Sequence, residues 1–404
     1  MSVSQRRLRL HAAMRPVGAM VRRAARHRHA PHTPSVLQLA REEWFLGVSV
    51  GASAIFLLFG DALFGALAGP AGMAAMFVIL FAVILTSSLS VVRHADHLAR
   101  QLGEPYGTLI LTLSVAVIEV VSVSAVIVHG DNNPTLARDS LLSVVMIILN
   151  GMVGASLLIG AWLHREQHYN LQGANTYLAV IIPLVVLSLV LPCFTRTTPG
   201  PTLSLAQSVF LILTSVGLYG AFLGIQTGRH RGYFADDGEG EGEAAMVADE
   251  AGPARPPVVH AMLLAAYLAP VIVLAEQLAR PVDYLIETLH APVAIGGVAL
   301  AALVAAPEAI GAVRGAFNNH LQRAVNIFLG SVLATIGLTV PAMLIISRLV
   351  GRSMILGVEG PDRVMLLLTL AVSMVTFSSG RTNVLQGAVH LVLFAAYLLL
   401  MFQG

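Results

Sequence analysis

One acidic residue inside a long apolar stretch constrains the fold of this chain more than any other feature. Residues 107–128, GTLILTLSVAVIEVVSVSAVIV, contain a single ionisable side chain, Glu119. About 20 apolar residues are enough to span a bilayer, and a carboxylate near its middle costs about 2.5–3.5 kcal/mol on insertion scales. The stretch therefore predicts a transmembrane helix whose carboxylate has a partner inside the membrane.

The whole chain has the composition of an integral membrane protein. Of its 404 residues, 56% are hydrophobic and 11% are charged, which excludes the soluble globular class. The single cysteine, Cys193, excludes an intramolecular disulfide and a multi-cysteine metal site. The sequence contains no HExxH motif and no paired-aspartate constellation, so an intramembrane enzyme is disfavoured. A transporter, an ion channel and a receptor or scaffold remain as alternatives.

Eleven apolar runs predict eleven transmembrane helices and an all-α membrane fold. The runs cover residues 44–67, 71–92, 106–128, 140–162, 174–193, 204–227, 258–279, 292–313, 324–347, 363–379 and 384–402. Residues 1–41 hold nine Arg and no acid, and we interpret them as a cytoplasmic tail rather than a mitochondrial transit peptide. With the N-terminus inside, 18 of the 24 Arg lie on the cytoplasmic side, as the positive-inside rule requires. We therefore expect a multi-pass protein of a bacterial inner membrane.

Two parts of the sequence match each other across an acidic, Gly-rich interruption at residues 232–257. This interruption cannot bury enough apolar surface to fold, so we predict a flexible cytoplasmic linker. Residues 95–100, ADHLAR, recur as residues 275–280, AEQLAR, and in each half a Glu follows twelve residues after a helix-opening Gly. The predicted divisions are a basic tail (1–41), a first helix (42–69), a five-helix repeat (70–231), the linker (232–257) and a second five-helix repeat (258–404). An odd number of helices per repeat inverts the second copy, which is the plan of many secondary transporters.

A shorter echo does not fit this repeat. Residues 171–174, LQGA, recur at residues 385–388, but the offset of 214 differs by 25 residues from the offset between the two glutamates. We interpret this echo as a coincidence.

The second glutamate, Glu308, is also the only ionisable residue of its run, 296–313. Pro307 has no N–H, so the carbonyl group of Leu303 loses its helical partner and a kink is predicted. Irregular backbone of this kind is tolerated where it lines a protein cavity. Other candidate oxygen ligands near the two glutamates are Thr112, Ser114, Ser122, Ser124, Asn150, Asn326, Ser331, Thr335 and Thr339, and Glu276 is a candidate acid at the outer mouth.

Two carboxylates with carbonyl and hydroxyl groups suit a hard cation. Calcium fits best on charge, because two carboxylates neutralise it, and sodium and potassium remain as alternatives. Low dielectric disfavours the charged form of the empty carboxyl groups, so we expect protons to bind there in competition with the cation. The predicted partners are inorganic cations, protons and lipid, with no cofactor and no nucleic acid. The oligomeric state stays open.

Several motifs carry a resemblance that runs from about Trp44 to the C-terminus. They are GEPYGTLILTLSVAVIEV (103–120), NLQGANTYLAV (170–180), YGAFLGIQTGRH (219–230), VAAPEAIGAVRGA (304–316), QRAVNIFLGSVLATIGLTVPA (322–342) and SGRTNVLQGAVHLVLFAAY (379–397). The chain resembles the calcium/cation–proton exchanger family of the calcium–cation antiporter superfamily, in its ChaA-type bacterial branch. This resemblance implies an eleven-helix inverted-repeat antiporter whose signature glutamates are Glu119 and Glu308.

The sequence departs from the wider family at two positions. The family pattern Gly-Asn-Ala-x-Glu would place an asparagine at Ala116 and at Ala305. An amide ligand is therefore absent from both halves, and the resemblance leaves calcium, sodium and potassium open as the exported cation.

Overall fold

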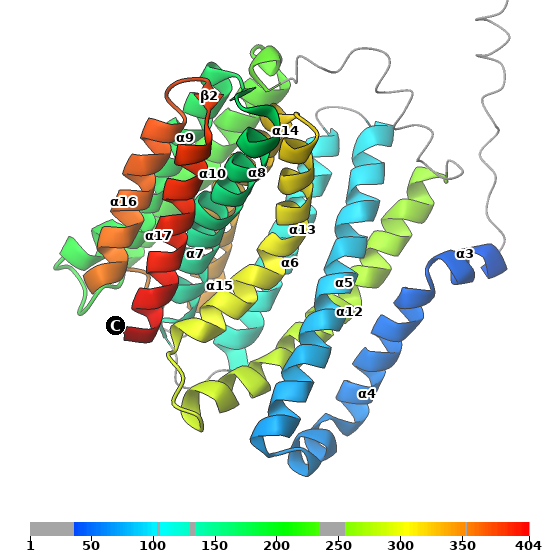
Figure 1. Ribbon diagram of the computed structural model, residues 1–404. Helices are drawn as coiled ribbons and strands as arrows, with labels where there is room; N and C mark the ends of the chain where they lie inside the picture. Colours follow the sequence, from blue (N-terminus) through cyan, green and yellow to red (C-terminus); the bar gives the residue numbers. More distant parts are fainter. Residues whose placement is uncertain (1–35, 103–105, 130–133, 235–254, 352–353, 404) are drawn as a thin grey trace, which may run out of the picture.

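The computed structural model describes residues 36–102, 106–129, 134–234, 255–351 and 354–403, and they form an almost entirely helical protein (Figure 1). Most of the predicted basic tail and of the predicted linker lies outside the described residues. The helices and strands, in chain order, are α3 (Val36–Glu42), α4 (Trp44–Ala66), α5 (Pro70–Leu102), α6 (Tyr106–His129), α7 (Leu136–Met146), η2 (Ile147–Met152), α8 (Val153–His164), β1 (Gln167–His168), α9 (Leu171–Val185), η3 (Val186–Val190), η4 (Leu191–Phe194), α10 (Leu205–Thr227), η5 (Arg231–Tyr233), α12 (Pro257–Glu287), α13 (Ala294–Phe317), α14 (Leu321–Ala334), η6 (Thr335–Thr339), α15 (Val340–Val350), α16 (Gly360–Thr376), β2 (Arg381–Thr382) and α17 (Val384–Gln403).

Every predicted apolar run coincides with a helix or with a set of consecutive helical segments. Within the described residues, nine of these spans are long and apolar enough to cross a membrane. The other two are α6, which appears as the shorter apolar segment Leu113–Ser124, and α16, which has 17 residues. The prediction of an all-α membrane protein is confirmed.

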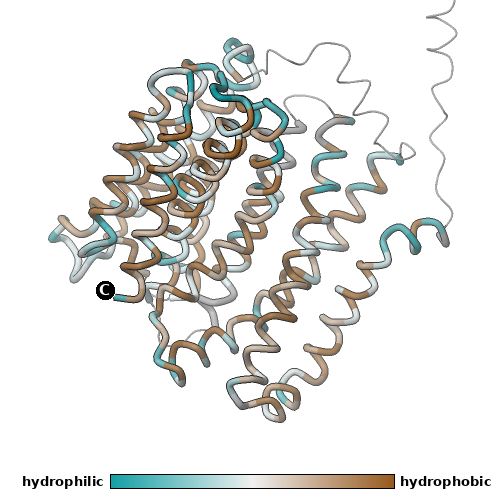
Figure 2. Tube along the Cα trace, viewed as in Figure 1, coloured by the Kyte–Doolittle hydropathy of each residue, from teal (hydrophilic) through white to brown (hydrophobic). Residues whose placement is uncertain are grey.

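The helices lie roughly side by side, with α4, α5 and α12 forming one side of the molecule (Figure 1). Helices α5 and α12 pack along each other, and α4 packs against α12. Apolar residues cover the helices along most of their length, whereas hydrophilic residues gather in α3 and in the loops at the helix ends (Figure 2). Large apolar side chains such as Leu58 and Leu349 are exposed, as expected where a helix faces lipid tails.

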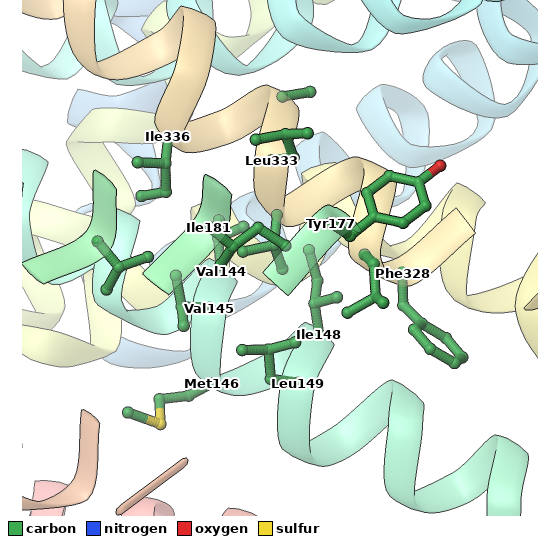
Figure 3. Close-up of a cluster of buried hydrophobic side chains, with 14 of the residues drawn as sticks. Val144, Val145, Met146, Ile148, Leu149, Tyr177, Ile181, Phe328, Leu333 and Ile336 are labelled. Atoms are coloured by element: carbon green, nitrogen blue, oxygen red, sulfur yellow. The ribbon is translucent and has the colours of Figure 1, made fainter. Parts of the chain in front are cut away.

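Two spans form the buried centre, and both contain a π-helical segment. In each half the span after the glutamate helix is interrupted at a matching place, by η2 after α7 and by η6 after α14. Ile148 and Leu149 of η2 lie in an apolar cluster with Ile181 of α9 and with Leu333 and Ile336 of the α14–η6 span (Figure 3). A π-helical turn inside an α-helix often marks a functional site. The repeated interruption is consistent with the repeat predicted from sequence.

The LQGA echo has a structural reason. Strands β1 and β2 pair antiparallel, and the helix after each strand begins at the echoed residues. The side chains of Asn170 and Asn383 accept hydrogen bonds from the backbone N–H groups of Gly173 and Gln386, each at 3.1 Å, and so cap α9 and α17. Both copies of the short match therefore build a capped helix start beside the strand pair, although they remain out of register with the larger repeat.

A buried ion cluster ties α4 to α5 and α12 at one end of the molecule. Glu43, just before α4, accepts hydrogen bonds from Arg93 (2.6 Å), Arg255 (2.9 Å) and Tyr267 (3.1 Å). Burial by itself would raise the pKa of Glu43, but the hydrogen bonds from His94 and Arg255 and the charge of Arg93 outweigh it and hold the pKa well below its ordinary value. Sequence analysis did not identify this cluster, because its members lie far apart in the chain.

Replacing Glu43 by Gln is expected to destabilise the protein by about 2 kcal/mol, because it removes the negative charge and one of the two oxygens that accept hydrogen bonds from Arg93 and Arg255. The lowered folded pKa means that this stabilisation is present above the ordinary value of 4.5 and is lost as the pH falls toward the folded pKa. Melting temperatures of the wild type and of Glu43→Gln in detergent should therefore differ at pH 7, and the difference should shrink steadily as the pH falls below ~4. A constant difference at every pH would contradict a role for the charge.

Candidate cation-binding site

Glu119, on α6, is the most enclosed carboxyl group of the central region. Only 2% of its surface is exposed. Its Oε2 atom accepts hydrogen bonds from Thr335 (2.9 Å) and from Thr339 (2.8 Å). Its Oε1 atom is buried and has no hydrogen-bond partner among the described residues. A buried carboxylate oxygen without a partner is costly, which makes this atom a candidate ligand for a proton or a cation.

Glu308, on α13, lies beside the same span and is partly exposed. Its Oε2 atom accepts a hydrogen bond from Ser331 at 2.6 Å. The helix continues through Pro307, whose missing N–H leaves the carbonyl group of Leu303 without its helical donor. The two glutamates therefore differ in access, because Glu119 is sealed and Glu308 is not.

One stripe of hydroxyl groups connects the two carboxyl groups. Ser331, Thr335 and Thr339 are spaced four residues apart along α14 and η6, so they lie on one helix face. Ser331 binds Glu308, and Thr335, one turn later, binds Glu119. Four residues of helix rise about 6 Å, so the two carboxyl groups lie within adjacent turns of the same stripe. The fold thus brings the two glutamates to the same row of hydroxyl groups.

The other predicted ligands have different positions. Asn150 is fully buried but binds Thr369 of α16, and Asn326 donates to the carbonyl oxygen of Phe234 at 2.7 Å. Ser114 is buried on α6, and Glu276 is partly exposed on α12. The side chain of Thr112 lies outside the described residues. In this conformation the structure brings Ser331, Thr335 and Thr339 to the glutamates and does not bring Asn150 or Asn326 there.

The site is asymmetric, since the hydroxyl groups seen to bond to the two glutamates among the described residues come from the second half. The offset of 189 residues between the glutamates pairs Ser331 with Leu142, Thr335 with Met146 and Thr339 with Asn150. The first-half stripe therefore carries two apolar side chains and one amide. Sequence comparison of the two halves at this offset would have detected the asymmetry.

In the part of the chain that the structure describes, the candidate ligand atoms of this site are all oxygens. Among the described residues, no group of three or more His, Cys, Asp or Glu could hold a metal ion. Two carboxyl groups, three hydroxyl groups and a released carbonyl oxygen suit a hard cation that is bound and released, rather than a tightly held transition metal.

Comparison with known proteins decides the family. The sequence pattern described as "Sodium/calcium exchanger protein" matches residues 72–228 and 259–403, two segments separated by an interval that contains the whole predicted linker. The chain belongs to the sodium/calcium exchanger family. Membership of this exchanger family makes the protein a transporter and not an enzyme.

Similar proteins agree with this placement. The chain is 42% identical over 319 residues to the sodium-potassium/proton antiporter ChaA of Escherichia coli strain K12, covering 79% of this chain and 86% of that relative. It is 25% identical over 272 residues to the Ca(2+)/H(+) antiporter ChaA of Bacillus subtilis strain 168, covering 65% and 75%.

Solved structures agree on the exchanger fold. The native structure of YfkE superposes with a TM-score of 0.67 at 21% identity, covering 89% of this chain and all of that one. The H+/Ca2+ exchanger CAX superposes with a TM-score of 0.63 at 14% identity, covering 89% and 88%.

Proposed function

We propose that this exchanger moves sodium or potassium out of the cytoplasm in exchange for entering protons. The observation that carries the proposal is the pair of glutamates joined by one hydroxyl stripe, with an unpartnered oxygen on Glu119. The relative at 42% identity, named a sodium-potassium/proton antiporter, supports the choice of cation. Calcium, which the sequence analysis put first, is the second candidate, because two carboxylates would neutralise its charge.

The site residues support exchange by competition. A proton or a cation satisfies the free oxygen of Glu119, but the two cannot occupy the same lone pair together. Ser331, Thr335 and Thr339 can each donate to an empty or protonated carboxyl group and can each offer the hydroxyl oxygen to a cation, since a hydroxyl group is both donor and acceptor. Binding of one ion therefore requires release of the other, and alternating access converts this competition into antiport.

The proposed membrane and orientation rest on the bacterial relatives and on the distribution of arginine. The relatives named above come from bacteria, and the arginine distribution of the sequence favours a cytoplasmic N-terminus. We therefore assign the protein to the bacterial inner membrane, with the end of the molecule that carries Glu43 and Arg255 facing the cytoplasm.

Proton movement in proteoliposomes tests the proposed function. Purified protein is reconstituted with a pH-sensitive dye inside, and sodium, potassium or calcium is added separately outside. We expect sodium and potassium each to drive proton release from the lumen, with a smaller response to calcium. Cation uptake without counter-movement of protons would indicate a channel, and a response to calcium alone would reverse the proposed order of cations.

A further inference from the structure

Asn150 and Thr339 hold equivalent positions in the two halves but have different partners. Each lies 31 residues after the glutamate of its own half, and each lies in a π-helix, Asn150 in η2 and Thr339 in η6. Thr339 donates to Glu119 at 2.8 Å. If the two halves made equivalent contacts, Asn150 would bond to Glu308. In this conformation Asn150 instead bonds to residues of other helices.

The amide group of Asn150 is held on the side of α16 and α17. Its Nδ2 atom donates to Thr369 Oγ1 at 2.8 Å and to the sulfur of Met146 at 3.4 Å. Its Oδ1 atom lies 3.3 Å from Nδ1 of His390. A thioether sulfur is a weak acceptor, so one of the two donor hydrogens of Asn150 is only weakly bound.

His390 fixes the orientation of this amide. The residue is fully buried on α17, and its Nε2 atom lies 2.9 Å from the hydroxyl group of Thr376. Because Oδ1 of Asn150 can only accept, Nδ1 of His390 is the donor in this pair. Both nitrogens of the imidazole therefore have a partner, Asn150 for Nδ1 and Thr376 for Nε2.

Asn150 lies on a segment that faces the site. The η2 segment packs against α13, which carries Glu308, and against α14, which carries Ser331. In transporters built from inverted repeats, alternating access is largely one repeat or bundle moving against the other around a fixed site. Symmetry between the repeats implies that, in the opposite state, the first half takes the contacts that the second half makes here.

We propose that Asn150 donates to Glu308 in the opposite access state, and that His390 is a positioning residue that holds Asn150 away from Glu308 in the present state. The inference rests on the proposed antiport function. It gives the first half an equivalent of the Thr339–Glu119 contact, although the first half lacks the hydroxyl stripe.

The test measures the apparent KM for sodium from each face, using right-side-out and inside-out vesicles. Asn150→Leu should raise the KM on one face by about 10-fold, the size expected for a lost hydrogen bond to a charged group, with little change on the other face. Asn150→Thr, which supplies the hydroxyl group that the second half uses, should recover most of this loss. His390→Leu should change the ratio of the two KM values without abolishing exchange.

Two matched variants separate positioning from other roles. Ser373→Ala removes a buried hydroxyl group that has no described partner and that lies on α16 between Thr369 and Thr376. It should leave both KM values unchanged. His390→Gln keeps one donor and one acceptor and should retain the wild-type ratio of KM values and the wild-type pH profile.

Three results would overturn the proposal. Equal KM changes on both faces in Asn150→Leu would show general damage to the site. Failure of Asn150→Thr to recover the loss would show that only packing matters at this position. Loss of proton coupling in His390→Gln would make His390 a proton carrier instead. Each of these results leaves proton-coupled sodium exchange by the wild-type protein intact, so the proposed function would survive them.

Discussion

Glu119→Gln is expected to abolish cation-driven proton movement while the protein remains folded. The amide oxygen of Gln can still accept the hydrogen bonds from Thr335 and Thr339, so the local packing is kept. The variant loses the negative charge that balances the cation. Removing one partner of a buried charge pair costs about 3–5 kcal/mol, which corresponds to a loss of about 100-fold or more in apparent affinity or rate. The dye assay in proteoliposomes measures this loss directly.

Glu308→Gln should fail in the same way, because its carboxyl group binds the same hydroxyl stripe. Glu287→Gln is the matched control, since it makes the same chemical change at the exposed end of α12. The control should exchange cations at the wild-type rate. Wild-type exchange by either site variant would contradict the mechanism. The melting temperatures of the purified wild type and variants show whether a loss of exchange comes from a loss of folding.

The sequence predicted the fold because its strongest signal, long apolar runs, is also the strongest physical constraint in a membrane. Runs around Glu119 and Glu308 predicted the helices on which the carboxyl groups lie. Helix ends were less predictable, since α5 and α12 continue beyond their apolar runs to Leu102 and Glu287. Polar residues at these ends pack between helices or face water. A search for apolar runs therefore stops before the helix ends.

The site was predicted in part. Ser331, Thr335 and Thr339 were candidates because they lie on the span after the second glutamate helix, and the structure brings all three to the carboxyl groups. Asn150 also lies on the span after a glutamate helix, but its amide group donates to Thr369 of α16 and not to a glutamate. Which way a buried amide turns depends on partners from α16 and α17, more than 200 residues away in the chain, and local sequence contains no information about them.

Replacing both Thr335 and Thr339 by Val is expected to raise the KM for the transported cation by at least about 10-fold, since each hydroxyl bond to a charged group is worth about 1.5–3 kcal/mol. Valine has nearly the shape of threonine, so the packing of η6 is largely kept while Glu119 loses both of its donors. The maximal rate should fall less than the affinity, because both carboxyl groups remain. Initial rates over a range of sodium concentrations in proteoliposomes separate the two parameters.

Ser347→Ala provides the control for this double variant, because it removes a buried hydroxyl group from the same span. That hydroxyl group donates to the carbonyl oxygen of Leu344 at 3.1 Å and has no part in the hydroxyl stripe. Its KM should equal that of the wild type. If the double variant also keeps the wild-type KM, the hydroxyl groups only hold Glu119 in place and the cation must take its ligands from the carboxyl and backbone oxygens. A raised KM confined to the double variant assigns the threonines to the cation itself, and a larger rise for sodium than for calcium would make the one-sided stripe a determinant of selectivity.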